Sequence, residues 1–481
     1  MQTNEGAFAY EHSLNHCLEF FSKAGSLYEN TTHFYANNES ALSLFQKAYI
    51  SDKETSLKLL FWLRNCRGGA GNRSAFRSII KWLGNNDSEV LNKNIHLIPH
   101  YGRYDDLRSL YKTKSHKNAV TFWAEALKKR DILAAKWTKR TDIPVGKKLG
   151  FKTEAEMRKF LVDIRREHIV EDKLTHKRYK DINYSQVSSL AMARYTNAFK
   201  RHDETRFNQY KESVKSGESK INSTVLFPHD CVRTAQNGDR EIADLQFENL
   251  PNYLENTNER IICIVDSSAS MGVNITKSLE AVDVAKGLAL YCSSKIPEDN
   301  IFHKKFIEFA DESEFKNWNN LEFSHAVNSY ELFTGTVGST RIDSALNLIL
   351  SEALINKLSN SEIPTMLVIL SDMQFHDGTN NGYLFNYKTR TEFHSISEYD
   401  TETEVERCLK KWDEHGYKRP KIVYWNLADY PGQQDTVNSN NIALISGFSP
   451  SILKSLFNGD IEKITPLSIM EDTIKEYDVN I

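Results

Sequence analysis

The sequence lacks most of the features that mark secreted, membrane and zinc-thiolate proteins. It has six cysteines among 481 residues and no C-x-x-C pair, which argues against a disulfide framework or a zinc site. No run of about 18 apolar residues is present, so no membrane-spanning helix is expected. The first residues show no basic start followed by an apolar stretch, so no secretory signal is expected either. Together these absences predict a cytoplasmic protein with reduced thiols and no membrane partner.

Common catalytic motifs are missing as well. The chain contains no G-x-S-x-G, H-E-x-x-H or Walker sequence. A hydrolase needs a nucleophile beside an activated base, or an open metal ion with an aimed water molecule. Because no general base accompanies the motifs described below, we expect a protein that is not an enzyme. A metal-dependent nuclease is the enzymatic alternative.

The net charge of −3 conceals two halves of opposite sign. Residues 1–250 contain 41 Lys and Arg against 30 Asp and Glu, a balance of +11. Residues 251–481 contain 20 basic against 34 acidic residues, a balance of −14. A basic half suits a polyanionic partner, whereas the acidic half is expected to do something else.

Helical periodicity dominates the basic half. Apolar residues recur at helical spacing, as in residues 76–83, and Ser51 with Glu54 forms a capping-box signature. Short helices without strand-like runs predict an α-helical domain of stacked helix pairs over residues 1–210, although no fixed sequence period is present. Residues 211–255 mix Lys, Ser, Gly, Asn and Glu, which predicts a connecting segment.

Strands and helices alternate in the acidic half, which predicts an α/β domain over residues 256–481. This alternation is typical of a mainly parallel, Rossmann-like sheet covered on both faces. The run at 301–309 alternates less cleanly and would suit an antiparallel edge. The predicted strands are residues 261–266, 301–309, 365–371, 421–426 and 441–446. The predicted helices are residues 275–294, 340–358, 401–415, 449–457 and 466–476.

Oxygen-bearing side chains follow two of these strands. Asp266 ends the first apolar run, and Ser268 and Ser270 follow at alternate positions. Asp372 follows the third predicted strand, and Thr340 follows a glycine-rich turn. Because the carboxyl ends of parallel strands meet at one edge, these oxygens should converge on Mg²⁺ or Mn²⁺. Water molecules or a partner's carboxylate would complete the octahedral shell. The alternative is a nucleotide-type domain in which Asp266 and Ser268 cap a helix.

Basic residues and aromatics alternate in the helical half, which suits single-stranded nucleic acid. Such a pattern offers stacking faces along an electrostatic track. Two bland alternatives are a solvated basic face and an ion-pair network in which Asp105 and Asp106 hold Arg103 or Arg108. The candidate RNA-binding residues are Arg64, Arg67, Arg73, Arg77, Arg103, Lys136, Lys139, Arg140, Lys147 and Lys148.

The D-x-S-x-S motif at Asp266, with the later Thr340 and Asp372, resembles the metal-ion-dependent adhesion site of von Willebrand factor A domains. The resemblance implies that Ser268, Ser270 and Thr340 bind Mg²⁺ or Mn²⁺ through their hydroxyls. It implies that the two aspartates act mostly through bound water and by orienting the serines. It also implies an acidic protein ligand at the metal. A von Willebrand A fold with a metal-free site is the alternative.

The segments R-x-x-R-G-G-x-G-x-R at 64–73, I-P-x-Y-G-R-Y-D-D-L at 98–107 and L-A-A-K-W at 133–137 carry a second resemblance. Together with a von Willebrand A domain, they resemble an uncharacterised family found in giant viruses, phages and plants. That plan is similar to the Ro autoantigen, whose TROVE domain of HEAT-like helical repeats closes into a ring. It implies a ribonucleoprotein component that binds single-stranded or structured RNA, in the host cytoplasm if the protein is viral. A protein-interaction or virion-assembly scaffold without nucleic acid is the alternative.

Overall fold

The structure, a computed structural model, forms two compact units, one helical and one of α/β type. It describes residues 14–27, 40–166, 168–223, 225–255, 259–276, 279–309, 313–335, 340–375, 404–428, 441–449, 451 and 465–481. Over these residues, the helical unit comprises Leu27 and residues 40–251 and 473–481. The α/β unit comprises residues 14–26 and 252–472. The predicted combination of an α-helical domain with an α/β domain is thus confirmed.

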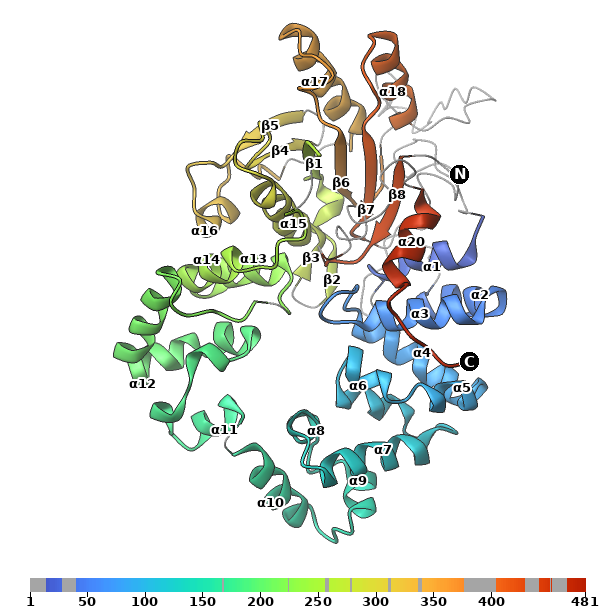
Figure 1. Ribbon diagram of the computed structural model, residues 1–481, viewed down its shortest axis with the longest axis vertical. Coiled ribbons are helices and arrows are strands. Elements are labelled where there is room, and N and C mark those ends of the chain that lie inside the picture. The colour runs from blue at the N-terminus through green and yellow to red at the C-terminus, as the bar shows by residue number, and fades with distance from the viewer. Residues whose placement is uncertain are drawn as a thin grey trace, which may run out of the picture. The chain divides into compact units, whose positions relative to one another are not determined.

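The described part of residues 40–251 contains helices and loops but no strand (Figure 1). Its α-helices are α2 (Ala41–Ser51), α3 (Lys53–Arg64), α4 (Arg73–Asn86), α5 (Ser88–Lys93), α6 (Leu97–Tyr101), α7 (His116–Lys128), α8 (Ile132–Trp137), α9 (Ile143–Lys148), α10 (Glu154–Arg165), α11 (Val170–Thr175), α12 (Ser189–Lys215), α13 (Pro228–Asn237) and α14 (Arg240–Glu248). Three 3₁₀ helices are η1 (Tyr104–Leu110), η2 (Tyr179–Asp181) and η3 (Tyr184–Gln186). Neighbours along the chain pack together, as α2 does with α3 and α13 with α14.

Two expectations for this unit were wrong in detail. The predicted connecting segment, residues 211–255, holds α13 and α14, whose apolar faces include the buried Val232 and Ile242. Its polar composition conceals amphipathic helices, because each needs only a few apolar residues to cover the core. The start of α3 is capped by Asp52 rather than Ser51. The carboxylate of Asp52 accepts the N–H of Thr55 at 3.0 Å.

The α/β unit is built on a six-stranded sheet in the order β5-β4-β1-β6-β7-β8 (Figure 1). All neighbouring strands are parallel except β4 and β5. A separate two-stranded sheet joins β2 and β3. The bounds are β1 (Ile261–Asp266), β2 (Asn274–Thr276), β3 (Leu279–Glu280), β4 (Lys305–Phe309), β5 (Ser313–Asn317), β6 (Met366–Ser371), β7 (Lys421–Asn426) and β8 (Ile442–Ser446).

The predicted strand at 301–309 is shorter than expected and is not the antiparallel edge. It begins at Lys305 and runs parallel to β1, whereas the antiparallel edge is β5. The sequence did not reveal β5, because four of its five residues are at most partly buried and its composition is polar. The helix predicted at 275–294 starts only at Ala281, because β2 and β3 precede it.

Helices cover both faces of the sheet. One core combines β1 residues Ile262 and Ile264 with side chains of α17 and α18. The residue between them, Cys263, instead contacts Cys292 of α15, and this thiol neighbour together with burial raises the pKa of Cys263. Successive side chains of a strand point to opposite faces of the sheet. Helices α17 and α18 therefore cover one face of β1, and α15 covers the other. The helices and the 3₁₀ turn of this unit are α1 (His16–Ala24), η4 (Ala269–Gly272), α15 (Ala281–Lys295), α16 (Phe323–Val327), α17 (Ile342–Ile355), α18 (Glu404–Glu414) and α20 (Pro466–Ile474), which ends in the helical unit. Most of the helix predicted at 449–457 lies outside the described residues.

Each chain end belongs to the unit built mainly from the opposite half of the chain, unlike the predicted division at 210 and 256. Near the N-terminus, Gly25 follows α1 and donates its backbone N–H to Ser446 Oγ at 3.0 Å. The Ser446 hydroxyl in turn donates to the carbonyl of Phe21 in α1. Near the C-terminus, Asn94 exchanges two hydrogen bonds with the backbone of Asn480, at 2.6 and 2.8 Å. Tyr477 accepts a hydrogen bond from Asn65 Nδ2 at 2.9 Å. No helix of the described residues is long and apolar enough to cross a membrane.

Candidate metal centre

The candidate site lies where the order of strands reverses. The chain passes from β1 to β4 on one side, and then returns to β6 on the other side of β1. In open α/β sheets, such a reversal leaves a crevice at the carboxyl ends of the two central strands, where ligands bind. Asp266 ends β1, and Ser371 ends β6 with Asp372 next to it. The order of strands thus places Asp266 and Asp372 at the same crevice.

Asp266 is held by donors from both strand ends. Its Oδ1 accepts the backbone N–H of Ser268 at 2.9 Å and the hydroxyl of the same residue at 2.6 Å. Its Oδ2 accepts the hydroxyl of Ser371 at 2.6 Å. The carboxylate is fully buried, with no exposed surface. It therefore orients Ser268 and ties β1 to β6 at the mouth of the crevice.

The three predicted hydroxyls form one cluster. Ser268 Oγ lies 3.0 Å from Ser270 Oγ, and Thr340 Oγ1 donates to Ser268 Oγ at 3.1 Å. Thr334 lies six residues before Thr340 in the sequence, but it donates to Glu308 through its N–H and its hydroxyl. Another nearby threonine, Thr336, lies outside the described residues. Of the two described threonines, Thr340 is therefore the one joined to the serine cluster.

Asp372, the fifth predicted residue of the site, interacts with Asp266 through its charge. Burial, followed by repulsion from Asp372, raises the pKa of Asp266 to about 7. Asp372 itself is 1% exposed, and its Oδ1 accepts the N–H of Gln374 at 3.1 Å. Two buried carboxylates in one crevice are costly unless a cation or a proton compensates them.

The donors fit a hard divalent cation. Carboxylate and hydroxyl oxygens suit Mg²⁺ or Mn²⁺, which accept water in the remaining positions. In the part of the chain that the structure describes, no group of three or more His, Cys, Asp or Glu side chains could hold a metal ion. A cation here would therefore depend on Ser268, Ser270 and Thr340 in addition to the two aspartates. Such a shell carries little negative charge and would favour an external carboxylate as a further ligand.

Ser371 is the site residue that sequence reasoning missed. Besides donating to Asp266, its hydroxyl accepts the N–H of Met373 at 2.9 Å. Met373 has a φ of 64°, in the left-handed region that residues with a side chain seldom occupy. Strained backbone of this kind clusters at functional sites. The sequence feature that could have identified Ser371 is its position at a strand end, next to Asp372.

Binding of Mg²⁺ should strengthen as the pH rises from 6 to 8. Because the pKa of Asp266 is raised to about 7, a proton occupies the carboxylate at lower pH and competes with the cation. We expect Mg²⁺ to raise the melting temperature little at pH 6 and fully at pH 8. An equal rise at both values would contradict this coupling. The control is Asp266→Asn, which should show no rise at either pH.

Two of the candidate RNA-binding arginines are engaged inside the helical unit. Arg64 is 2% exposed, and its Nε donates to Asp106 Oδ2 at 2.8 Å. Arg77 donates to Asp106 Oδ1 at 2.7 Å and to Asp105 Oδ2 at 2.8 Å. The ion-pair network anticipated for Asp105 and Asp106 thus exists, but chiefly with these arginines, since Arg108 pairs mainly with Asp142. Both hydrogen bonds hold the Arg77 guanidinium within this network, so Arg77 is not part of the proposed interface.

The other basic candidates are more accessible. Arg103 places its guanidinium 4.3 Å from the ring centre of Trp137, and Lys136 lies 6.0 Å from the same ring centre. Lys136 also lies 3.6 Å from Glu171, and Arg140 lies 3.4 Å from Glu154. The exposed candidates are Arg67, Arg73, Lys139, Arg140, Lys147 and Lys148.

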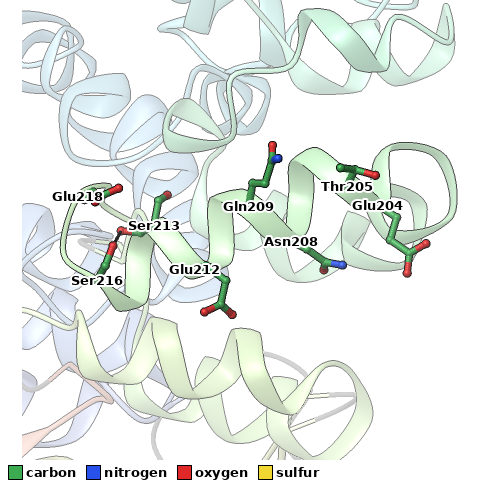
Figure 2. Close-up of a pocket in the computed structure, with 8 residues that line it drawn as sticks. All are labelled: Glu204, Thr205, Asn208, Gln209, Glu212, Ser213, Ser216 and Glu218. Atoms are coloured by element: carbon green, nitrogen blue, oxygen red, sulfur yellow. Dashed lines mark hydrogen bonds between the residues drawn. The ribbon is translucent and has the colours of Figure 1, made fainter.

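A shallow hollow of about 750 Å³ lies along α12, but it has the wrong charge for RNA. Its lining contains three glutamates and no basic residue, so it would repel a phosphate backbone. Figure 2 shows these side chains along α12 and in the turn that follows it. The lining residues are Glu204, Thr205, Asn208, Gln209, Glu212, Ser213, Ser216 and Glu218.

Fold and crevice define a protein with an α-helical unit and an α/β unit that carries an oxygen-lined site. Residues 3–101 and 124–267, about half of the chain, match the family described as "Domain of unknown function (DUF2828)", so the chain belongs to this family. Residues 260–478 match "Domain of unknown function (DUF7788)". The chain is also similar to an uncharacterized protein of Acanthamoeba polyphaga mimivirus, with 23% identity over 541 residues covering 99% of this chain and 88% of the relative. This relative supports the expected membership of an uncharacterised family with viral members.

Proposed function

We propose that the protein is a non-enzymatic, Ro-like RNA-binding protein in which a von Willebrand A-like α/β unit binds Mg²⁺ and captures an acidic partner. The observation that carries the metal-binding part is the convergence of Asp266, Ser268, Ser270 and Thr340 through hydrogen bonds. Their order along the chain, with Asp372 last, resembles a metal-ion-dependent adhesion site. In this proposal, a carboxylate of the partner occupies a position of the metal shell that water fills otherwise.

The RNA-binding part of the proposal rests on charge and on stacking groups. The basic half carries the excess of +11, and Arg103 lies over Trp137 at 4.3 Å. Phosphates would contact the exposed basic residues, while bases would stack on aromatic rings and guanidinium planes. In this proposal, the helical unit has a TROVE-like architecture of HEAT-like repeats. The protein acts in the cytoplasm, which is that of the host cell if the protein is viral.

Affinity for single-stranded RNA should fall steeply with salt. If about four phosphates are neutralised, the logarithm of the association constant should change with a slope of about −3 against the logarithm of salt concentration. Filter binding between 50 and 300 mM salt measures this slope. Replacing Lys147 and Lys148 together by alanine should make it shallower. The same change at Lys357 and Lys418, two exposed lysines of the α/β unit, should leave it unchanged.

The outcome separates the alternatives. Absent or salt-insensitive binding would contradict RNA binding and favour the protein-interaction or virion-assembly scaffold. A purified protein without associated nucleic acid would point the same way. Cleavage of labelled RNA in Mn²⁺ that disappears in Asp266→Asn would instead favour the metal-dependent nuclease.

A further inference from the structure

Arg64 ends α3 and Arg73 begins α4, so these two arginines flank the glycine-rich loop of residues 68–71 in the helical unit. Arg103 is joined to Arg64 through Asp106. Arg64 Nε and the backbone N–H of Arg103 both donate to the same oxygen, Asp106 Oδ2, at 2.8 and 3.0 Å. Gly102 permits this close packing. A Cβ at that position would lie 2.6 Å from Asp106 Oδ2 and 2.8 Å from Arg64 Nε. The fold therefore fixes Arg64 against the segment that carries Arg103.

Arg64 retains an unused donor. Its Nη2 is buried and has no hydrogen-bond partner among the described residues. A buried donor of a charged group is costly to leave without a hydrogen bond, so folded proteins usually supply a partner or a ligand. Asp106 does not fill this role, because its oxygens already accept from Arg64 Nε, Arg77 and Arg103.

Arg103 lies close enough to Arg64 and Arg73 for their charges to act on its guanidinium. Burial, followed by the charges of Arg73 and Arg64, lowers the pKa of Arg103. Arg73 is exposed and is the first residue of α4, a 14-residue helix whose N-terminus adds partial positive charge. Trp137 supports the guanidinium of Arg103 at 4.3 Å. Asp105 opposes part of this repulsion, and a bound anion would relieve it further.

We propose that Arg64, Arg73 and Arg103 form a phosphate-binding site on the helical unit. Guanidinium groups bind phosphate oxygens through paired hydrogen bonds, and a helix N-terminus favours the same ligand. This inference deepens the proposed function, on which it rests in naming RNA as the source of the phosphate. The proposed ligand is a phosphate at an RNA end or in its backbone. Inorganic phosphate shares its chemistry.

The test uses the full-length protein and two probes. Inorganic phosphate, compared with chloride at equal ionic strength, should raise the melting temperature of the wild type. A labelled single-stranded RNA, made with and without a 5′-phosphate, should bind in competition with inorganic phosphate. We expect Arg73→Gln and Arg103→Gln each to weaken both interactions about tenfold, since each removes charge-assisted hydrogen bonds.

Two further variants keep the test specific. Arg158→Gln removes an exposed arginine from α10 and should leave both probes unaffected. Arg64→Lys keeps a positive charge beside Asp106 but removes Nη2, and should weaken phosphate binding without abolishing folding. Circular dichroism verifies that each variant is folded.

The results distinguish this inference from the proposed function. Phosphate binding that depends on Arg73 and Arg103, without any RNA binding, would support the site and overturn RNA as its source. RNA binding unaffected by these variants would overturn the site and leave the proposed function standing. Preference for RNA with a 5′-phosphate would assign the site to an RNA end, whereas equal binding would assign it to the backbone. Failure of both probes would contradict both proposals.

Discussion

Replacement of Asp266 by asparagine should weaken Mg²⁺ binding by about 100-fold, an effect at the upper end of that seen when groups orienting metal ligands are changed. The carboxylate accepts two hydrogen bonds from Ser268 and one from Ser371. An amide of the same shape offers one acceptor oxygen, and its NH₂ group would face a donor. Ser268 would lose its orientation, and the crevice would lose one of its two negative charges. Isothermal titration with Mg²⁺ and Mn²⁺ measures the loss.

The matched control is Glu414→Gln, an exposed residue of α18 that changes the net charge equally. This variant should bind Mg²⁺ like the wild type. An Asp266→Asn protein that is folded and binds Mg²⁺ normally would show that the metal, if any, lies elsewhere. Ser270→Ala should give a smaller loss, because it removes one of three hydroxyls without disturbing the bonds of Asp266.

Replacement of Asp106 by alanine should lower the free energy of unfolding of the helical unit by about 3–5 kcal/mol. Asp106 is fully buried and pairs with Arg64, whose side chain is 3% exposed. It also accepts from Arg77 at 2.7 Å. Its loss leaves the Arg64 guanidinium buried without a counter-charge, which is far costlier than the net value of the intact pair. Urea unfolding followed by circular dichroism measures the change.

An exposed pair of the same unit provides the comparison. Asp163 pairs with Arg130 at 2.7 Å, with both side chains more than half exposed. Asp163→Ala should therefore cost at most about 1 kcal/mol. Equal losses in the two variants would mean that burial does not set the strength of the Asp106 network.

Buried strands were the part of the fold that the sequence predicted best. The bounds of β1 and β7 agree with the predicted 261–266 and 421–426, because a parallel strand covered on both faces is apolar between its ends. An edge strand lacks this signature. β5 was missed because only Lys316 among its five residues is fully buried.

The placement of the chain ends could not be read from local pattern. Nothing in residues 16–24 distinguishes a helix that packs on β8 from one that packs in a helical domain. The pairing of Asn94 with Asn480 is likewise a contact between distant residues whose types are common in loops. Such assignments depend on tertiary packing, to which a single sequence gives no direct access.

The candidate metal site was more predictable than the basic surface. All five proposed residues lie at strand ends or at a helix start, and hydrogen bonds join four of them. In contrast, the residue type alone did not show that Arg64 is buried while Arg73 is exposed. The difference arises from Asp106, a partner that is distant in sequence and close in space.

The most direct test of the Mg²⁺ site is the anomalous scattering of a crystal soaked in Mn²⁺, which substitutes for Mg²⁺. We predict a peak within bonding distance, about 2.1 Å for a cation of this kind, of the hydroxyls of Ser268 and Ser270. Thr340 should complete the protein's hydroxyl ligands, with Asp266 and Asp372 in contact through water. A well-ordered crevice without an anomalous peak at saturating Mn²⁺ would contradict the account.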